Sequence, residues 1–280
     1  MTVEVRLSTP DRLDEVLGLA VDAISIGQEG CAAKLPDAAA LGPALERVRG
    51  AGLRAGLVLP AAWQRGAEAL VELAVGLARH GALTVTVNDL GTLAALAAVD
   101  LPDCELAVGL ALLPGRPHDA AENPRSVLEP IVYEPAFLGE LEGLGPRVLE
   151  ADPTAVVPRE AHWRIRRLTD AVPLAWARSC PTARHHRLPL TACRSACDTP
   201  LAISATHRWQ LGHGHLEPIA VADRPHQPPL TVYGNAVYAT APAAPAPGGE
   251  VIVDARFHPR TALAERVAVL RSQQPVTASP

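Results

Sequence analysis

The chain has 280 residues, a formal net charge of −5 and 48% hydrophobic residues, which is ample for one large hydrophobic core or two small ones. That apolar fraction excludes wholesale disorder, and the acidic balance excludes a nucleic-acid reader that works by bulk positive charge. No apolar run approaches the ~20 residues of a membrane span, and the strand-like N-terminus carries Glu4 and Asp11, unlike a signal peptide, so we expect a cytoplasmic protein.

The first 110 residues alternate short apolar runs with helical patterns. Strands are predicted over 3–9, 23–27, 55–60, 83–89 and 105–110, and helices over 10–20, 37–50, 62–79 and 90–99. Strands this short and this continuously apolar are typical of a parallel sheet that is covered on both faces.

The second half is less regular. Strands are predicted over 131–134, 147–151, 173–177 and 250–255, an Arg-rich helix over 159–170 and a closing helix over 261–273. About eight strand–helix steps fit an α/β fold of the (β/α)8 TIM-barrel type, built as a single domain over 1–280. A doubly wound open sheet is the alternative, and the absence of G-x-G-x-x-G after the first strand disfavours its dinucleotide-binding form.

Two segments interrupt this pattern. Residues 178–229 are rich in Cys, His, Arg and Pro, and residues 241–249 are a Pro/Ala-rich stretch that we expect to be an exposed loop.

Three cysteines lie within 18 residues of this excursion, with the spacing Cys180-x12-Cys193-x3-Cys197. An odd total of five cysteines without an export signal argues against a disulfide framework. Because the stretch is polar, these thiols are better explained as ligands of a metal or a cluster than as core fillers. Cys31 follows the strand 23–27 and Cys180 follows the strand 173–177, so a barrel would bring both to its catalytic rim.

The fifth cysteine, Cys104, begins a strand and is assigned to structure. Four thiolates can hold Zn2+ or an iron–sulfur cluster. Structural zinc sites usually contain two closely spaced ligand pairs, whereas here Cys193 and Cys197 form the one such pair and Cys31 is remote. The spacing therefore favours a [4Fe–4S] cluster, with zinc left open.

Other polar residues are expected on the same rim. Glu29 follows a strand, and Asn88 and Asp89 end one. All three are candidate catalytic groups, although Asp89 is equally suited to cap the helix at Leu90. Lys34 is the single lysine among 25 basic residues. Together with Arg178 and Arg184, which flank Cys180, it is a candidate for substrate binding. The alternatives for the arginines are hydrogen bonds to cluster sulfurs and a solvated surface.

At these residues the sequence resembles the UbiV-type branch of the U-32 peptidase (collagenase-like) family, the oxygen-independent ubiquinone-biosynthesis factors. The resemblance covers most of the chain, at residues 27–37, VNDLGTL, PLAWARSCPTAR, the Cys193/Cys197 pair and the final VIVDARFHPRTALAERVAVLR.

The resemblance implies a barrel-like fold and a [4Fe–4S] cluster on Cys31, Cys180, Cys193 and Cys197. It also implies O2-independent hydroxylation of an aromatic or quinone-precursor substrate, with a UbiU-like sister subunit and a small anionic prephenate-like oxygen donor. Two alternatives stay open: a non-catalytic scaffold that carries a structural cluster or zinc, and a peptidase of the kind that the family name suggests.

Overall fold

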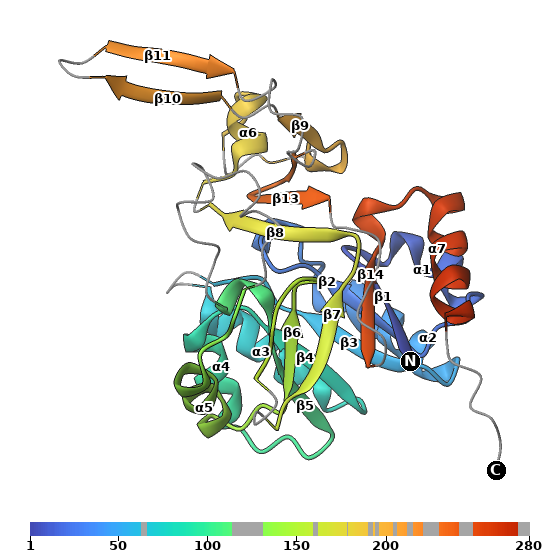
Figure 1. Ribbon diagram of the computed structural model, residues 1–280. Coiled ribbons are helices and arrows are strands. Elements are labelled where there is room, and N and C mark those ends of the chain that lie inside the picture. Colours follow the sequence, from blue (N-terminus) through green and yellow to red (C-terminus); the bar gives the residue numbers. More distant parts are fainter. Residues whose placement is uncertain are drawn as a thin grey trace.

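Eight parallel strands close into a barrel in the computed structural model of the chain (Figure 1). The structure describes residues 1–62, 66–113, 131–158, 162–177, 179–189, 193, 196–203, 206–211, 215–220, 230–240 and 249–273. The barrel strands are β1 (Thr2–Leu7), β2 (Ala23–Gly27), β3 (Arg54–Val58), β4 (Leu83–Val87), β5 (Cys104–Val108), β6 (Val148–Ala151), β7 (Arg164–Leu168) and β14 (Glu250–Asp254). They are paired in chain order, and β14 closes the barrel between β7 and β1.

Helices connect most of these strands along the outside. They are α1 (Leu13–Leu17), α2 (Ala38–Gly50), α3 (Ala67–Ala78), α4 (Leu90–Ala97), α5 (Pro135–Gly143) and the closing α7 (Arg260–Ser272). Short 3-10 turns lie at Pro10–Arg12, Ala32–Lys34, Leu110–Leu112 and Ala255–Phe257. The predicted (β/α)8 TIM-barrel-like class is confirmed, and no described helix is long and apolar enough to cross a membrane.

The inside of the barrel is polar, contrary to the expectation of strands that are apolar on both faces. In β1, Val3, Val5 and Leu7 face the helices, whereas Glu4 and Arg6 point inward and are buried. A buried ion-pair network fills the interior because each inward charge meets an opposite one. Its members are Glu4, Arg6, Ser25, Thr86, Glu150 and Arg166.

Arginine and glutamate alternate around this network. Arg6 pairs with Glu150, and Arg166 pairs with Glu4. Ser25 Oγ donates to Glu4 at 2.5 Å, and Thr86 Oγ1 donates to Glu150 at 3.0 Å. Burial would raise the pKa of Glu4, but the neighbouring Arg166 and Arg6 hold it below its usual value. The network therefore favours the charged form of the Glu4 carboxylate although that side chain is buried.

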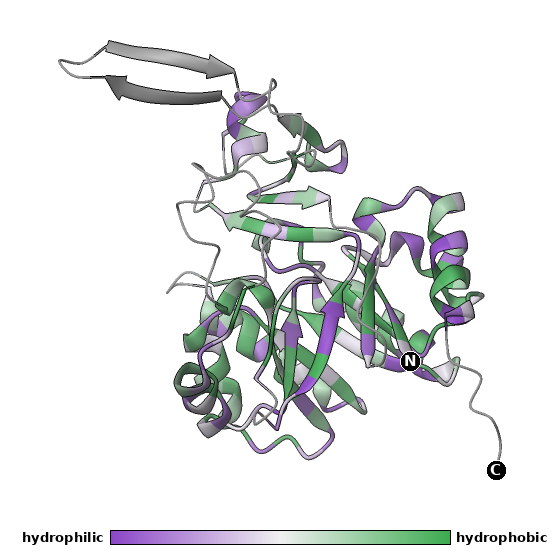
Figure 2. Ribbon diagram, in the orientation of Figure 1, coloured by the Kyte–Doolittle hydropathy of each residue, from purple (hydrophilic) through white to green (hydrophobic). Residues whose placement is uncertain are grey.

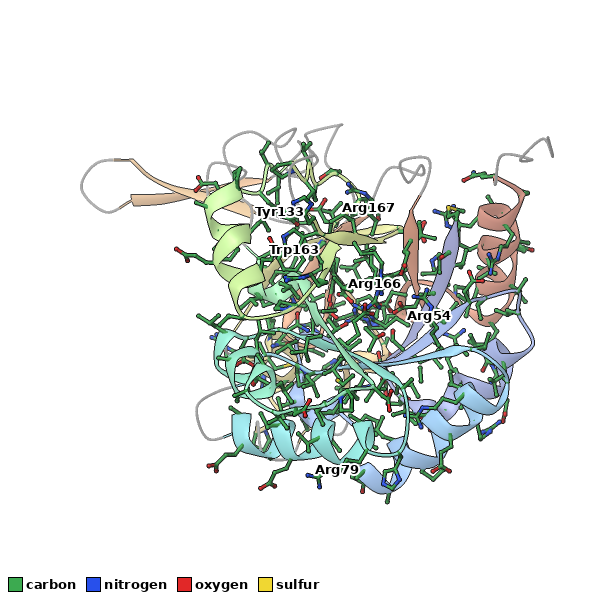
Figure 3. The ribbon with its side chains drawn as sticks, turned by 90° about the horizontal axis from the view of Figure 1, so that it is seen from below. Arg54, Arg79, Tyr133, Trp163, Arg166 and Arg167 are labelled. Atoms are coloured by element: carbon green, nitrogen blue, oxygen red, sulfur yellow. The ribbon has the colours of Figure 1, made fainter. Side chains whose placement is uncertain are left out.

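The Arg-rich helix predicted over 159–170 is wrong in its described part, since residues 164–168 form the barrel strand β7. Arginine is a good helix former, so the sequence suggested a helix. In the strand, Arg166 points into the barrel (Figure 3), while Arg167 points outward and donates to the carbonyl oxygens of Asp152 and Ala155 at 3.3 and 2.8 Å. Figure 2 shows most of β7 in purple, the colour of hydrophilic residues.

Two further strand predictions change place. Residues 131–134 contribute one parallel bridge, between Val132 and Val156, and no barrel strand. The strand predicted over 173–177 exists as β8 (Ala171–Trp176), but it belongs to a second sheet outside the barrel. Seven of the predicted strands belong to the barrel, and β7, which was predicted as a helix, is the eighth.

The second sheet has four antiparallel strands in the order β8-β13-β12-β9, and it comes from the chain between β7 and β14. Its other strands are β9 (Leu201–Ile203), β12 (Leu230–Tyr233) and β13 (Ala236–Thr240), accompanied by the short helix α6 (Pro181–His185) and a 3-10 turn at Ala196–Asp198. The hairpin β10 (Thr206–Leu211)–β11 (His215–Ala220) projects from this region (Figure 1). Parts of the expected excursion at 178–229 and residues 241–248 of the expected loop lie outside the described residues.

The second sheet covers the end of the barrel at which the strands finish. Tyr238 of β13 packs with Leu168 at the end of β7 and with Ile252 in the middle of β14, and its hydroxyl donates to Glu29 beyond β2. We call this four-stranded sheet the cap.

Candidate functional site

The order of strands in the cap brings three chain segments together at one end of its strands, which we call the edge of the cap. Trp176, at the end of β8, is paired with Ala236, at the start of β13. Val232, near the end of β12, is paired with Leu201, at the start of β9. The end of β8, the β12–β13 turn and the start of β9 therefore meet, and the segments that carry Cys180 and Cys197 flank this edge.

Cys31 reaches the same edge from the barrel. Strand β2 ends at Gly27, which has φ +119°, and a Cβ there would lie 2.1 Å from the carbonyl oxygen of Val58. Only glycine fits this turn of the chain. The following residues lead to Gly30, whose carbonyl oxygen accepts a hydrogen bond from the side chain of Asn235 in the β12–β13 turn.

The four thiols predicted as ligands are close enough to influence one another electrostatically. Burial raises the pKa of Cys31, backbone N–H groups of its own loop oppose this, and the charges of Cys180 and Cys193 raise it further. Burial likewise raises the pKa of Cys197, with Lys34 opposing and Cys31 and Cys180 adding to the increase. Cys31 thus lies near three cysteines that follow it by about 150 residues or more in the sequence.

The fifth thiol lies elsewhere. Cys104 begins β5, at the opposite end of the barrel, where burial and then Glu105 raise its pKa to about 11. Such a thiol stays protonated and unreactive at neutral pH.

Local hydrogen bonds orient two of the clustered thiols. Cys180 Sγ accepts from the backbone N–H of Ala183 at 3.3 Å and so caps α6. Cys197 is buried, and its Sγ lies beside Gly234, 3.7 Å from where a Cβ would stand. Among the described residues, no three His, Cys, Asp or Glu side chains converge tightly enough to hold a single metal ion.

An ion pair joins the segment of Cys31 to the segment of Cys197. Lys34, three residues after Cys31, pairs with Asp198, the neighbour of Cys197. The Lys34 side chain is 9% exposed and the Asp198 side chain 71% exposed.

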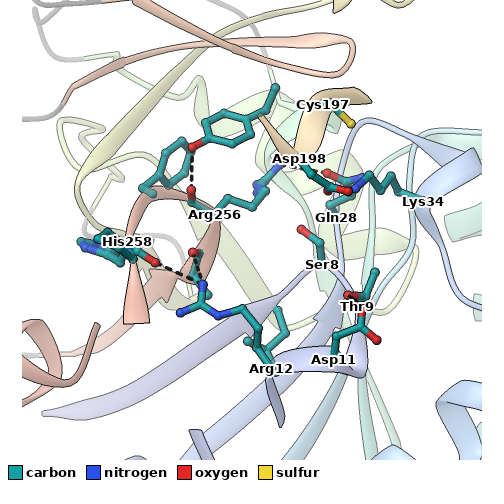
Figure 4. Close-up of a pocket in the computed structure, with 15 residues that line it drawn as sticks. Ser8, Thr9, Asp11, Arg12, Gln28, Lys34, Cys197, Asp198, Arg256 and His258 are labelled. Carbon is teal, nitrogen blue, oxygen red and sulfur yellow. Dashed lines mark hydrogen bonds and ion pairs between the residues drawn. The ribbon is translucent and has the colours of Figure 1, made fainter. Parts of the chain in front are cut away.

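A cavity of about 550 Å³ lies next to this ion pair (Figure 4). Its wall comes from the ends of β1, β2 and β14 and from the Cys197 segment. The polar lining residues are Ser8, Thr9, Asp11, Arg12, Gln28, Lys34, Asp198, Arg256 and His258. Arg12 Nη1 donates to the carbonyl oxygens of Ala255 and His258 at 2.7 and 3.1 Å, which ties the loop after β1 to the loop after β14.

Behind the cavity wall, Arg256 is held by two buried carboxylates. Its Nη2 lies 2.6 Å from Asp254 Oδ2 and 2.8 Å from Glu29 Oε1. Tyr238 donates to the same Glu29 carboxylate. Burial would raise the pKa of Glu29, but Arg256 and Arg6 lower it to about 2. Glu29 is therefore ionised at neutral pH.

The other two rim candidates make hydrogen bonds to backbone. Asn88 is buried, donates to the carbonyl oxygen of Leu59 at 2.8 Å and accepts from Ala111 N–H at 3.0 Å. Asp89 caps α4 through Thr92 N–H at 2.8 Å and also accepts from Ala62 N–H at 3.0 Å. These contacts agree with the capping alternative for Asp89.

Of the two arginines beside Cys180, the structure describes Arg184. Arg184 lies exposed on α6, and Arg178 falls outside the described residues. Sequence reasoning missed Arg256, Tyr238 and Asn235. Arg256 follows the predicted strand 250–255, so the strand-end rule that selected Glu29 would have found it. Tyr238 and Asn235 belong to the cap, which has no comparable signal.

Comparison with known proteins gives a limited result. No family model matches the chain, and no curated protein matches it. One matching solved structure, titled "The Structure of the U32 Peptidase Mk0906", aligns with 92% of this chain and 94% of its own, at 16% identity and a TM-score of 0.47. At these values the likeness carries no argument about chemistry.

Proposed function

We propose that Cys31, Cys180, Cys193 and Cys197 hold a [4Fe–4S] cluster between the cap and the barrel. One observation carries this proposal: the segments of Cys31, Cys180 and Cys197 meet at the β12–β13 turn, through hydrogen bonds of Asn235 to Gly30 and Ala177 and the approach of Cys197 to Gly234. Cys104, by contrast, begins a strand at the far end of the barrel.

The spacing of the thiols along the chain supports a cluster over a zinc ion. Structural zinc sites usually contain two closely spaced ligand pairs. Here Cys193 and Cys197 form one such pair, and Cys31 is remote in the sequence. One distant thiol with a later group of three is more typical of a [4Fe–4S] site.

We propose further that the chain takes part in O2-independent hydroxylation of an aromatic or quinone-precursor substrate, together with a UbiU-like sister subunit. When bound, a cluster with four cysteine ligands supplies electrons rather than an open Lewis-acid site. The cavity beside Cys197 supports this activity, because a volume of about 550 Å³ admits a small molecule next to the cluster site. A scaffold role would leave such a cavity without a use.

The charges around the cavity support an anionic, prephenate-like oxygen donor. Arg256 is already neutralised by Asp254 and Glu29. Lys34 is different, since its partner Asp198 is an exposed carboxylate that water screens. A carboxylate of the donor would replace Asp198 on the Lys34 ammonium. Arg184 and Arg178 are proposed to assist at the entrance, and Glu29 is proposed to position Arg256.

Cysteine replacements test the cluster assignment. In protein purified without O2, replacing any one of the four proposed ligands with Ala should abolish iron and acid-labile sulfide. Cys104→Ala is the matched control, which should keep both and lose about 1–2 kcal/mol of folding free energy. Retention of the full cluster in two of the four variants, or its loss in the Cys104 variant, would contradict the assignment.

Peptide hydrolysis tests the activity that the family name suggests. Anaerobically prepared protein with a full complement of iron should leave an unfolded protein substrate uncleaved. Cleavage that disappears when Cys31 is replaced would instead favour the peptidase alternative.

A further inference from the structure

The β12–β13 turn consists of Gly234 and Asn235. These two residues contact the segments that carry Cys31, Cys180 and Cys197. This turn joins two antiparallel strands through two residues. Gly234 has φ +62° and occupies the first central position, as in the type II′ turns that hairpins favour. The turn thus has a defined shape that its own sequence specifies.

Asn235 ties the Cys31 segment to the Cys180 segment. Its side-chain amide donates to the carbonyl oxygen of Gly30, immediately before Cys31. The same amide donates at 3.2 Å to the carbonyl oxygen of Ala177, three residues before Cys180. Its backbone carbonyl also accepts from Ala177 N–H at 2.7 Å.

Gly234 contacts the segments of Cys180 and Cys197. Its carbonyl oxygen accepts from the backbone N–H and from Oγ1 of Thr182, at 3.3 and 3.2 Å, which fixes the start of α6 after Cys180. A Cβ on Gly234 would stand 3.7 Å from Cys197 Sγ. The backbone of the turn therefore forms part of the surface against which Cys197 lies.

We propose that the Gly234–Asn235 turn is a template that sets the spacing of the cluster ligands, with Asn235 as its positioning residue. Loops hold a fixed geometry only where hydrogen bonds fix them, and groups behind metal ligands commonly tune both affinity and electronic structure. The inference rests on the proposed cluster. It adds that a side chain with no sulfur positions the segments that carry the thiolates of Cys31 and Cys180.

The test compares two Asn→Asp substitutions. Asn235→Asp has the same shape but loses the N–H donors to Gly30 and Ala177. Asn88→Asp is the matched control, because Asn88 also donates to a backbone carbonyl, that of Leu59, in a loop without a clustered cysteine. Iron content, the electron paramagnetic resonance spectrum of the reduced cluster and the rate of cluster loss to a chelator are measured anaerobically.

Asn235→Asp should shift the resonance spectrum and accelerate cluster loss by about tenfold or more, whereas Asn88→Asp should retain the wild-type spectrum and rate. Equal spectra and equal loss rates for the two variants would overturn the template. Wild-type protein without iron and sulfide would instead overturn the proposed cluster itself, so the two failures are distinguishable.

A second pair of variants, Gly234→Ala and Gly52→Ala, tests the template if the Asn235→Asp variant does not fold. Gly234→Ala places a methyl group against Cys197, whereas Gly52→Ala creates the same kind of backbone strain, at φ +75°, with no atom within 4 Å. The template requires an altered resonance spectrum in the Gly234 variant and an unaltered one in the Gly52 variant. Identical spectra in this pair would contradict it.

Discussion

Arg256 and Glu29 form a buried two-point ion pair, with Arg256 Nη2 at 2.8 and 3.0 Å from the two carboxylate oxygens. The pair joins the loop after β14 to the loop after β2, which are neighbours of the first barrel strand on either side. Tyr238 of the cap donates to the same carboxylate, so this charged group is one of the contacts that hold the cap on the barrel. The loop that continues to Cys31 begins at this anchor.

Removing the charge of Glu29 should therefore destabilise the protein strongly. Glu29→Gln leaves Arg256 buried with one carboxylate in place of two, at an expected cost of about 3 kcal/mol in the free energy of unfolding. Glu105→Gln is the control, since Glu105 and its partner Arg164 are 37% and 41% exposed and should cost about 1 kcal/mol or less. Urea unfolding measures both, and equal losses would contradict the anchor.

Acid should weaken the fold through the same residue. The pKa of Glu29 is lowered from 4.5 to about 2, so between these values the unfolded chain binds a proton that the folded chain does not. Stability is then fully present above about pH 5 and falls towards pH 2 by about 3 kcal/mol from this group. The lowered pKa values of Glu4 and Asp170 act in the same direction. Glu29→Gln should flatten part of the decline, and an unchanged slope would argue against this cause.

The burial of each arginine in β7 should determine how much its replacement lowers the free energy of unfolding. Arg166 lies in the buried network with Glu4, so Arg166→Leu should cost about 3–5 kcal/mol because Glu4 loses its partner. Arg164 points the same way from the same strand but lies at the open end of the barrel, where its side chain is 41% exposed. Arg164→Leu should cost about 1 kcal/mol or less. Thermal or urea unfolding distinguishes them, and the helix first expected for this segment would not predict this order.

Lys34 should matter for binding more than for folding. Lys34→Gln should weaken binding of prephenate about tenfold or more, because a charged hydrogen bond is lost. Its free energy of unfolding should change by about 1 kcal/mol or less, since the partner Asp198 is exposed. Arg47→Gln, which breaks another exposed pair with Asp14, is the control. Anaerobic calorimetry gives the affinities, and unchanged binding by the Lys34 variant would remove it from the donor site.

The sequence predicted the barrel because its strands and helices follow simple periodicities. The strands at 23–27 and 250–254 were located almost to the residue, and the closing helix also agrees. The Arg-rich segment failed because burial of arginine depends on partners such as Glu4, 162 residues away along the chain. Local pattern contains no information about such a partner.

The spacing of the cysteines predicts a shared ligand site, which stays a prediction, but it does not predict how the chain brings them near one another. Cys180 was expected at the barrel rim as the continuation of a barrel strand, whereas β8 belongs to the cap. The segment of Cys180 still approaches that of Cys31 because both are hydrogen-bonded to Asn235. The proposed role of Asn235 depends on the strand pairing of the cap, which a single sequence does not reveal.

Iron and acid-labile sulfide, measured per chain after purification without O2, test the central claim most directly. The account predicts about four iron and four sulfide per chain. The Cys104→Ala variant should hold them as firmly as the wild type does. One equivalent of zinc without sulfide, or protein that folds fully with no metal at all, would contradict it.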